Sequence, residues 1–249
     1  MPKRRATVRL AHLSGRYNRP AWLLRRQLRD AAVSADIITV TEVDRPKRGK
    51  ALRDVPGFLA LRHGGGGDWG ESAVLFRDGV WRVRRVGYYL LARDLDGMRK
   101  GQVAVLALLE HVSTGRTLLV SVTHTPSGVE AAWSSARARQ YRDTSQTWRR
   151  LVREWRRDHR PDAELLVADW NLDAHKPWVR EHTHAAWPGM KQVSPPPIGG
   201  THGKRLIDWP LTRRVRGVKV RILAKTAASD HRPIGITGTI RPRKRKEHR

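Results

Sequence analysis

Four carboxylates stand at or near the ends of short apolar runs, where a fixed backbone can hold a side chain at the rim of a sheet. They are Glu42 after the run 37–41, Asp169 after 165–168, Asp208 within 206–209, and Asp230 before His231. Acidic residues are scarce, since the chain has 23 Asp and Glu against 50 Lys and Arg. One carboxylate at a strand end is usually a turn residue or a helix cap. Four of them beside His or Asn favour a site that does chemistry.

The side chains at these positions suit metal-assisted hydrolysis of a phosphate ester. Mg²⁺ prefers oxygen ligands and usually takes only one or two protein carboxylates, which Glu42 and Asp230 would provide. Asp169 and Asn171 are two residues apart, so on an extended backbone they point the same way. An aspartate can orient or deprotonate water, and an asparagine amide can hydrogen-bond a phosphate oxygen.

A histidine completes this set. His231 could act as a general base or could contact the phosphate, and the residues alone leave both roles open. A buried aspartate such as Asp208 would orient its ring. The chain has no cysteine, which excludes disulfides, zinc–thiolate sites and thiol catalysis.

Alternation of apolar and polar residues predicts the elements that would position these side chains. We expect helices at 20–33, 131–157 and 178–187, and strands at 7–13, 36–43, 72–77, 80–89, 103–110, 117–123, 165–168, 206–211, 218–223 and 234–240. The turn at Asp78 and Gly79 predicts a hairpin between the strands 72–77 and 80–89. A second pair is expected across 113–115, and loops at 64–67 and 194–200. Many strands with helices inserted between them favour an α/β sandwich of packed sheets flanked by helices.

Length and composition favour one domain over 7–240, with a basic arm at 1–6 and a basic tail at 241–249. No apolar stretch has the length that a membrane span needs. No apolar segment of signal-peptide length follows the basic N-terminus. We therefore expect a cytoplasmic monomer that makes no membrane contact.

The ordered segments 41–43, 123–126, 168–171, 207–209 and 229–233 resemble the endonuclease/exonuclease/phosphatase superfamily. Its members include pancreatic deoxyribonuclease, exonuclease III and the abasic-site endonucleases. The motifs occur in the family's order and span nearly the whole chain. The resemblance implies a four-layer α/β sandwich, with two mixed sheets packed face to face and helices outside.

For the metal, the resemblance implies Mg²⁺, with Mn²⁺ as the alternative. Glu42 resembles the family's metal-binding glutamate, and Asp230 resembles the aspartate that contacts the metal from the last motif. The family's opening strand usually ends in an asparagine that helps to bind metal. Ser14 stands at that position here, and a hydroxyl is a weaker ligand than an amide oxygen.

For catalysis, the resemblance implies that Asp169 and Asn171 position the nucleophilic water and the phosphate. It implies that His231 is the catalytic histidine and that Asp208 is its partner. His124 resembles the family's mid-chain histidine or tyrosine near the scissile phosphate.

The substrate is predicted from charge, because the same fold serves several phosphate chemistries. A net charge of +27 favours a polyanion, although an arginine-biased composition would raise it without any binding function. The expected contacts to nucleic acid are Lys204, Arg205, Arg137, Arg139 and Arg142. The chain is thus predicted to be a Mg²⁺-dependent phosphodiesterase acting on DNA, or on RNA. The alternatives are hydrolysis of a small phosphate ester or phospholipid, and nucleic-acid binding without turnover.

Overall fold

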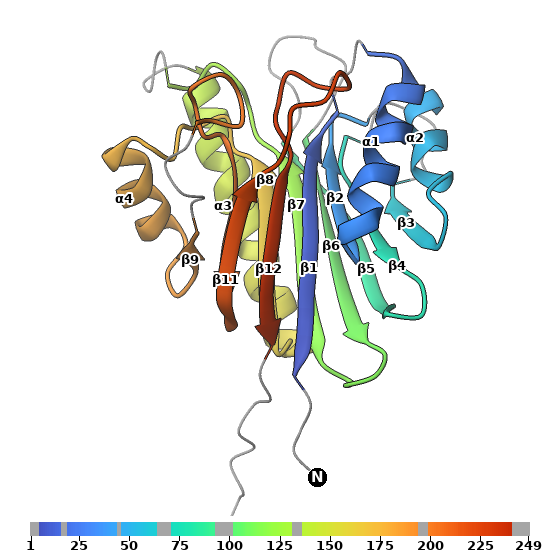
Figure 1. Ribbon diagram of the computed structural model, residues 1–249. Coiled ribbons are helices and arrows are strands. Elements are labelled where there is room, and N and C mark those ends of the chain that lie inside the picture. The colour runs from blue at the N-terminus through green and yellow to red at the C-terminus, as the bar shows by residue number, and fades with distance from the viewer. Residues whose placement is uncertain are drawn as a thin grey trace, which may run out of the picture.

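Two six-stranded sheets pack face to face in this protein, with helices on both outer sides (Figure 1). The computed structural model describes residues 5–15, 19–43, 46–63, 71–92, 102–130, 136–193 and 199–240. The first sheet has the order β11 (Val215–Ile222), β12 (Ile234–Ile240), β1 (Ala6–Ser14), β2 (Ile37–Thr41), β4 (Ala73–Arg77) and β3 (Phe58–Arg62). The second has the order β5 (Trp81–Ala92), β6 (Gln102–His111), β7 (Thr117–His124), β8 (Ala163–Asp169), β10 (Asp208–Arg213) and β9 (Lys191–Gln192).

The helices form the outer layers. They are α1 (Ala21–Ser34), α2 (Pro46–Arg53), α3 (Ala136–His159) and α4 (Pro177–Ala186). Leu24 and Leu28 of α1 share a buried cluster with Ile38 of β2. Trp148 of α3 shares another with Leu166 of β8. The predicted four-layer sandwich is therefore confirmed.

Strand β8 is apolar at successive positions, without alternation, because both of its faces are buried. Leu166 and Ala168 belong to the cluster under α3, whereas Leu165 and Val167 belong to the cluster between the two sheets. Successive side chains of a strand point to opposite faces. A strand buried on both faces needs apolar residues at every position.

Register brings several strand ends to one edge of the sandwich. In the first sheet, Ser14 of β1 lies opposite Thr41 of the parallel strand β2. In the second, Asp169 lies opposite both His124 and Asp208. Strand β12 is antiparallel to β1, so it begins at the same edge. Figure 1 shows the end of β1 and the start of β12 at this upper end.

The predicted hairpin at Asp78 and Gly79 is wrong. Strand β4 pairs with β2 and β3, and β5 pairs with β6 in the other sheet. Gly79 has the left-handed φ of 76° that a tight turn requires, but this turn carries the chain from one sheet to the other. Trp81 is buried between the sheets directly after it. Local turn residues predict a reversal, and burial between the sheets decides the pairing partner.

The other predicted elements are present with shifted ends, and the hairpin of β6 and β7 is confirmed. The sequence did not predict α2, β3 or β9. The loop at 64–67, most of the predicted loop at 194–200, the first five residues of the predicted helix at 131–157, most of the N-terminal arm and the tail at 241–249 lie outside the described residues. In the described part of the chain, no helix combines the length and apolar character that a membrane crossing requires.

Replacing Leu165 with Ala tests the core between the sheets. The side chain is fully buried, so we expect the free energy of unfolding to fall by about 2–5 kcal/mol. Val33→Ala is the control, because Val33 is 85% exposed on α1 and its loss should change stability by about 0.5 kcal/mol or less. Urea denaturation measures both. An equal effect of the two substitutions would contradict the buried position of Leu165.

Candidate active site

Two stacked indoles fix the pair of aspartates at the centre of the site. Trp170 and Trp209 are buried and lie parallel, with ring centroids 4.2 Å apart and an angle of 9° between the planes. The Trp170 Nε1–H donates to the Trp209 carbonyl at 2.8 Å. Each tryptophan follows one of the aspartates, Asp169 and Asp208, which are opposite each other in the ladder. These tryptophans pack in the core and are not available to stack on a base.

His231 is held against Asp208. The ring Nδ1–H donates to Asp208 Oδ2 at 2.8 Å, and the backbone N–H donates to the hydroxyl of Ser229 at 3.0 Å. Burial would lower the pKa of His231, but the charge of Asp208 and the hydrogen bond to it, with Asp169 and Glu42, raise the pKa to about 9. The ring is therefore a cation at neutral pH.

Asp208 has further partners on its other side. His12 of β1 places Nε2 3.4 Å from Asp208 Oδ1, and its Nδ1 lies 3.0 Å from the hydroxyl of Thr39. The hydroxyl of Thr201 accepts the backbone N–H of Asp208 at 3.1 Å. Burial would raise the pKa of Asp208, but His231 and His12 hold it well below its usual range.

A second histidine lies beside Asp169, near the same carboxylate oxygen as His231. His124 Nε2 is 3.6 Å from Asp169 Oδ2, and its Nδ1 is 3.6 Å from Glu71 Oε2. Burial would lower the pKa of His124, but Glu71, Asp169 and Glu42 raise it to about 10. Asp169 itself is fully buried, and burial together with Asp208 raises its pKa despite the two histidines.

Glu42 approaches this cluster from the end of β2. Its φ is 58°, a left-handed conformation that is rare outside glycine and often found at functional sites. The buried Arg48 of α2 donates to the Glu42 carbonyl at 3.1 Å and to the Arg19 carbonyl at 2.7 Å. Burial, Asp169 and Glu71 raise the pKa of Glu42, while the histidines lower it.

Asn171 also has a left-handed φ, of 52°. Its backbone N–H donates to Asp169 Oδ1 at 3.1 Å, and its side-chain Nδ2 donates to the Thr125 carbonyl at 2.8 Å. The turn is braced from outside, because Arg205 Nη2 donates to the Asn171 carbonyl at 3.2 Å and to Glu130 Oε2 at 3.0 Å. Arg205 thus holds the loop that presents the amide.

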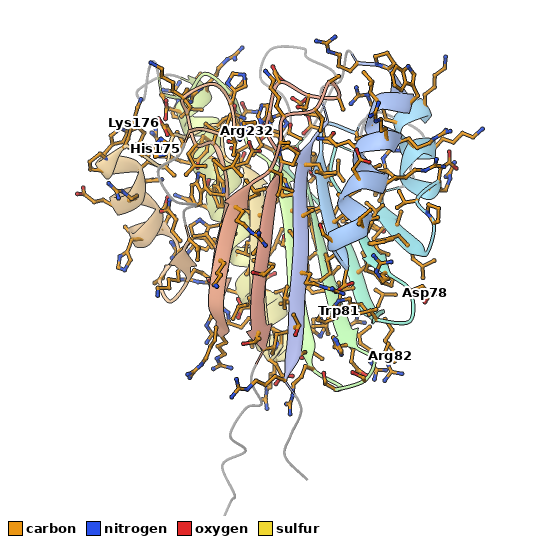
Figure 2. The ribbon with its side chains drawn as sticks, viewed as in Figure 1. Asp78, Trp81, Arg82, His175, Lys176 and Arg232 are labelled. Atoms are coloured by element: carbon orange, nitrogen blue, oxygen red, sulfur yellow. The ribbon has the colours of Figure 1, made fainter. Side chains whose placement is uncertain are left out.

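The remaining predicted nucleic-acid contacts lie around the site end. Lys204 is exposed on the loop before β10, and Arg137, Arg139 and Arg142 lie on the first turns of α3, which begins at that end (Figure 1). Figure 2 shows Arg232 at the same end and Asp78 and Arg82 at the opposite one. Contact of these cations with nucleic acid stays a prediction.

The donor set fits a divalent cation. Ser14 is only 2% exposed, and its hydroxyl has no hydrogen-bond partner within the described residues. Glu42 is half-buried and Asp169 is fully buried, and burial is the main cause that raises the pKa of each carboxylate. A bound cation would stabilise the charged form of both.

Asp230 and Glu42 do not share a cluster of possible metal ligands in the described residues. The described residues contain two clusters with the spacing to hold an ion, namely His202, Asp230 and His231, and Asp169, Asp208 and His231. Glu42 belongs to neither. Asp230 Oδ2 is instead 3.5 Å from His202 Nε2.

Sequence reasoning missed several residues that shape the site: His12, Arg48, Glu71, Glu130, Thr201 and His202. Glu71 and Glu130 were visible as carboxylates in an acid-poor chain, and Glu71 precedes an apolar run as the other site carboxylates follow one. No local pattern marks the other four. His12 meets Asp208 only through tertiary pairing, whereas Arg48 and Thr201 act on residues six or seven positions away through side-chain hydrogen bonds that no sequence pattern indicates.

No protein-family profile and no curated protein matches the sequence. Solved structures do match, and the chain has the fold of the endonuclease/exonuclease/phosphatase family.

The chain is similar to a family member from Bacteroides thetaiotaomicron, with a TM-score of 0.72 and 13% identity over 96% of this chain and 100% of that one. A mannosyl-6-phosphatase from B. thetaiotaomicron VPI-5482 matches with a TM-score of 0.69 and 14% identity, over 92% of this chain and 98% of that one. D. rerio TDP2 complexed with a single-strand DNA product matches with a TM-score of 0.66 and 12% identity, over 94% of this chain and 99% of that one. TM-scores of 0.66 to 0.72 at identities of 12 to 14% show that these proteins share a fold and nothing more. They confirm the predicted four-layer architecture.

Two substitutions at Asn171 test the strained turn. Both Asn171→Gly and Asn171→Ala lose the bond to the Thr125 carbonyl, but only alanine must hold a left-handed φ against its Cβ. We expect the alanine variant to be less stable than the glycine variant by about 1 kcal/mol in urea denaturation. Equal stability, or a more stable alanine variant, would contradict the left-handed conformation.

Proposed function

We propose that this chain is a divalent-metal-dependent phosphodiesterase that hydrolyses nucleic acid, with DNA ahead of RNA. The observation that carries the proposal is the hydrogen-bonded pair of His231 and Asp208 beside the buried Asp169, whose Oδ2 is 3.8 Å from His231 Nε2. A cationic donor and a carboxylate of raised pKa then stand side by side at one edge of the sandwich. The carboxylate can activate water, and the cationic donor can stabilise the charge that develops on the phosphate.

Asp169 is the proposed base. The oxygen of a water molecule would attack phosphorus, and its proton would pass to Asp169. The ester P–O bond would break, and the leaving oxygen would take a proton from solvent. The raised pKa of Asp169, caused by burial and by Asp208, brings it closer to the working pH of a general base. The bond from its Oδ1 to the Asn171 N–H fixes the orientation of the carboxylate.

His231 and Asn171 are proposed to stabilise the charge that develops on the phosphoryl oxygens. With its pKa raised to about 9, His231 enters as a donor, which favours phosphate contact over the general-base role. Asn171 Nδ2 uses one hydrogen for the Thr125 carbonyl, and an amide nitrogen has a second one to offer.

Glu42 and Asp230, with the unpartnered hydroxyl of Ser14, are the proposed ligands of the cation. Mg²⁺ is the first choice and Mn²⁺ the second, because the set is dominated by oxygen atoms. A bound divalent cation supplies Lewis-acid polarisation of the phosphoryl group.

Charge supports nucleic acid as the substrate. The chain carries +27, and a long polyanion gains from cations spread over a surface, whereas one phosphate needs only a few in a pocket. Among the similar structures, TDP2 is bound to a single-strand DNA product, and another is a mannosyl-6-phosphatase. The fold therefore accommodates both substrate classes.

Removal of the base or of the metal tests the reaction. We expect cleavage of an end-labelled DNA duplex in Mg²⁺ to fall at least about 100-fold in Asp169→Ala, because general-base catalysis contributes that much or more. A chelator should abolish cleavage, and added Mg²⁺ should restore it. Asp78→Ala is the matched control, since this exposed aspartate lies at the opposite end (Figure 2) and should leave the rate unchanged. Cleavage that survives both the chelator and Asp169→Ala would sink the proposal.

Salt distinguishes the substrate classes. Between about 50 and 200 mM salt, a protein that contacts several phosphates loses orders of magnitude in affinity. We expect KM for a DNA duplex to rise steeply over this range, and KM for bis(p-nitrophenyl) phosphate to change little. A flat response with DNA, together with efficient turnover of a small ester, would favour a phosphatase acting on a small substrate.

A further inference from the structure

Helix α3 carries a row of arginines on its outer face, away from the residues that pack on the sheet. Trp148, Val152 and Trp155 form its buried side. The opposite side lines an open depression of about 540 Å³, whose walls are Gln146, Arg149, Arg150, Arg153, Glu154 and Arg157. Four arginines and one glutamate therefore surround this depression, which we call the α3 arginine groove.

Three of these arginines have no carboxylate partner among the described residues. Arg157 is paired with Asp158 at 2.8 Å. Arg156, on the neighbouring side of the helix, forms an ion pair with the buried Glu164. Over the ranges that the structure describes, no carboxylate lies within ion-pair distance of Arg149, Arg150 or Arg153.

Burial and repulsion between neighbouring arginines both act on Arg149. Partial burial and the positive charge of Arg153 lower the pKa of Arg149. Unpaired guanidinium groups one helical turn apart cost free energy unless an anion lies among them. The groove is thus built for anions, and the planar guanidinium fork matches phosphate oxygens.

The groove is remote from the active site. Helix α3 begins at the site end of the sandwich and runs toward the opposite end (Figure 1). Arg153 is 17 residues beyond Ala136, the first residue of the helix. At about 1.5 Å per residue this is about 25 Å along the axis. A single phosphate therefore cannot contact both the active site and this groove.

We infer that the α3 arginine groove is an exosite for the sugar-phosphate backbone of a nucleic acid chain whose other part lies in the active site. This inference rests on the proposed function, because it takes the same polyanion as substrate. Arg149, Arg153 and Arg157 follow one another every four residues, about 6 Å apart along the axis. A line of cations suits successive phosphates better than one isolated phosphate.

The separation sets a length requirement. Base pairs of a duplex rise about 3.4 Å each, so about 7 or 8 pairs span the 25 Å between the start of α3 and the groove. A shorter duplex held in the active site cannot reach the arginines. A longer one gains their contacts.

The test compares two DNA lengths in a triple variant, Arg149→Gln, Arg150→Gln, Arg153→Gln. All binding is measured by fluorescence anisotropy on the Asp169→Ala background, where the DNA is not consumed. For a 24-base-pair duplex we expect Kd to rise about tenfold or more, and the slope of log Kd against log salt to fall by up to about 0.9 per lost phosphate contact. For a hairpin with five base pairs, Kd should stay within about twofold.

A matched control removes the same charge elsewhere. Arg85, Arg216 and Lys219 are exposed on β5 and β11, and replacing each with Gln also lowers the net charge by three. We expect this control to bind both DNAs like the parent. Circular dichroism checks that both triple variants remain folded, as surface substitutions should.

Several outcomes would overturn the inference. Equal weakening by the control would mean that only net charge matters, and equal weakening of the five-pair hairpin would mean that the arginines serve the active site. Displacement of the long duplex from the groove by inorganic phosphate at equal phosphate concentration would indicate a single-anion site. Cleavage by the wild-type chain is assayed separately, so the proposed function can fail while the length-dependent binding holds, and the reverse.

Discussion

Two buried carboxylates that face each other across a β-ladder repel unless cations lie beside them. Asp169 and Asp208 are in this position, and the protein places His231 between them, with His12 on the other oxygen of Asp208 and His124 beside Asp169. The result is a cluster of opposite charges in which Asp208 stays ionised and Asp169 keeps a raised pKa. Different environments thus move the pKa values of two identical side chains in opposite directions, which is the pattern that acid–base sites use.

The cost of this arrangement is met by the packing beneath it. Trp170 and Trp209 stack in the core and fix the backbone on which both aspartates stand. Glu42 and Asn171 keep left-handed φ values because Arg48 and Arg205 hold the carbonyl groups of these two turns. Strained residues persist where the surrounding structure over-determines them, and they cluster at functional sites. Arginine therefore serves inside this protein as a structural donor as well as on its surface as a cation.

The excess of positive charge has different consequences in different places. Many arginines are neutralised, such as Arg9 and Arg77 on Asp36, and Arg156 on Glu164. Those left without a carboxylate on the outer face of α3 are a minority of the total. A composition rich in arginine does not by itself define a binding surface, because pairing decides which cations remain for a ligand. The structure separates the two groups, which the count of charges cannot do.

The sequence by itself determined the strands and helices with strong periodicity, and the order of the motifs that carry Glu42, Asp169 and Asp208. These depend on local patterns, since burial on both faces makes β8 apolar and a strand end can present a carboxylate. Tertiary structure alone decided that the turn at Asp78 and Gly79 joins two sheets and does not form a hairpin. It also decided that His12 and Glu71 belong to the site, and that Arg205 braces a loop. Such contacts join residues far apart in the chain, and they exist only because the register of two packed sheets brings the ends of separate strands to one edge.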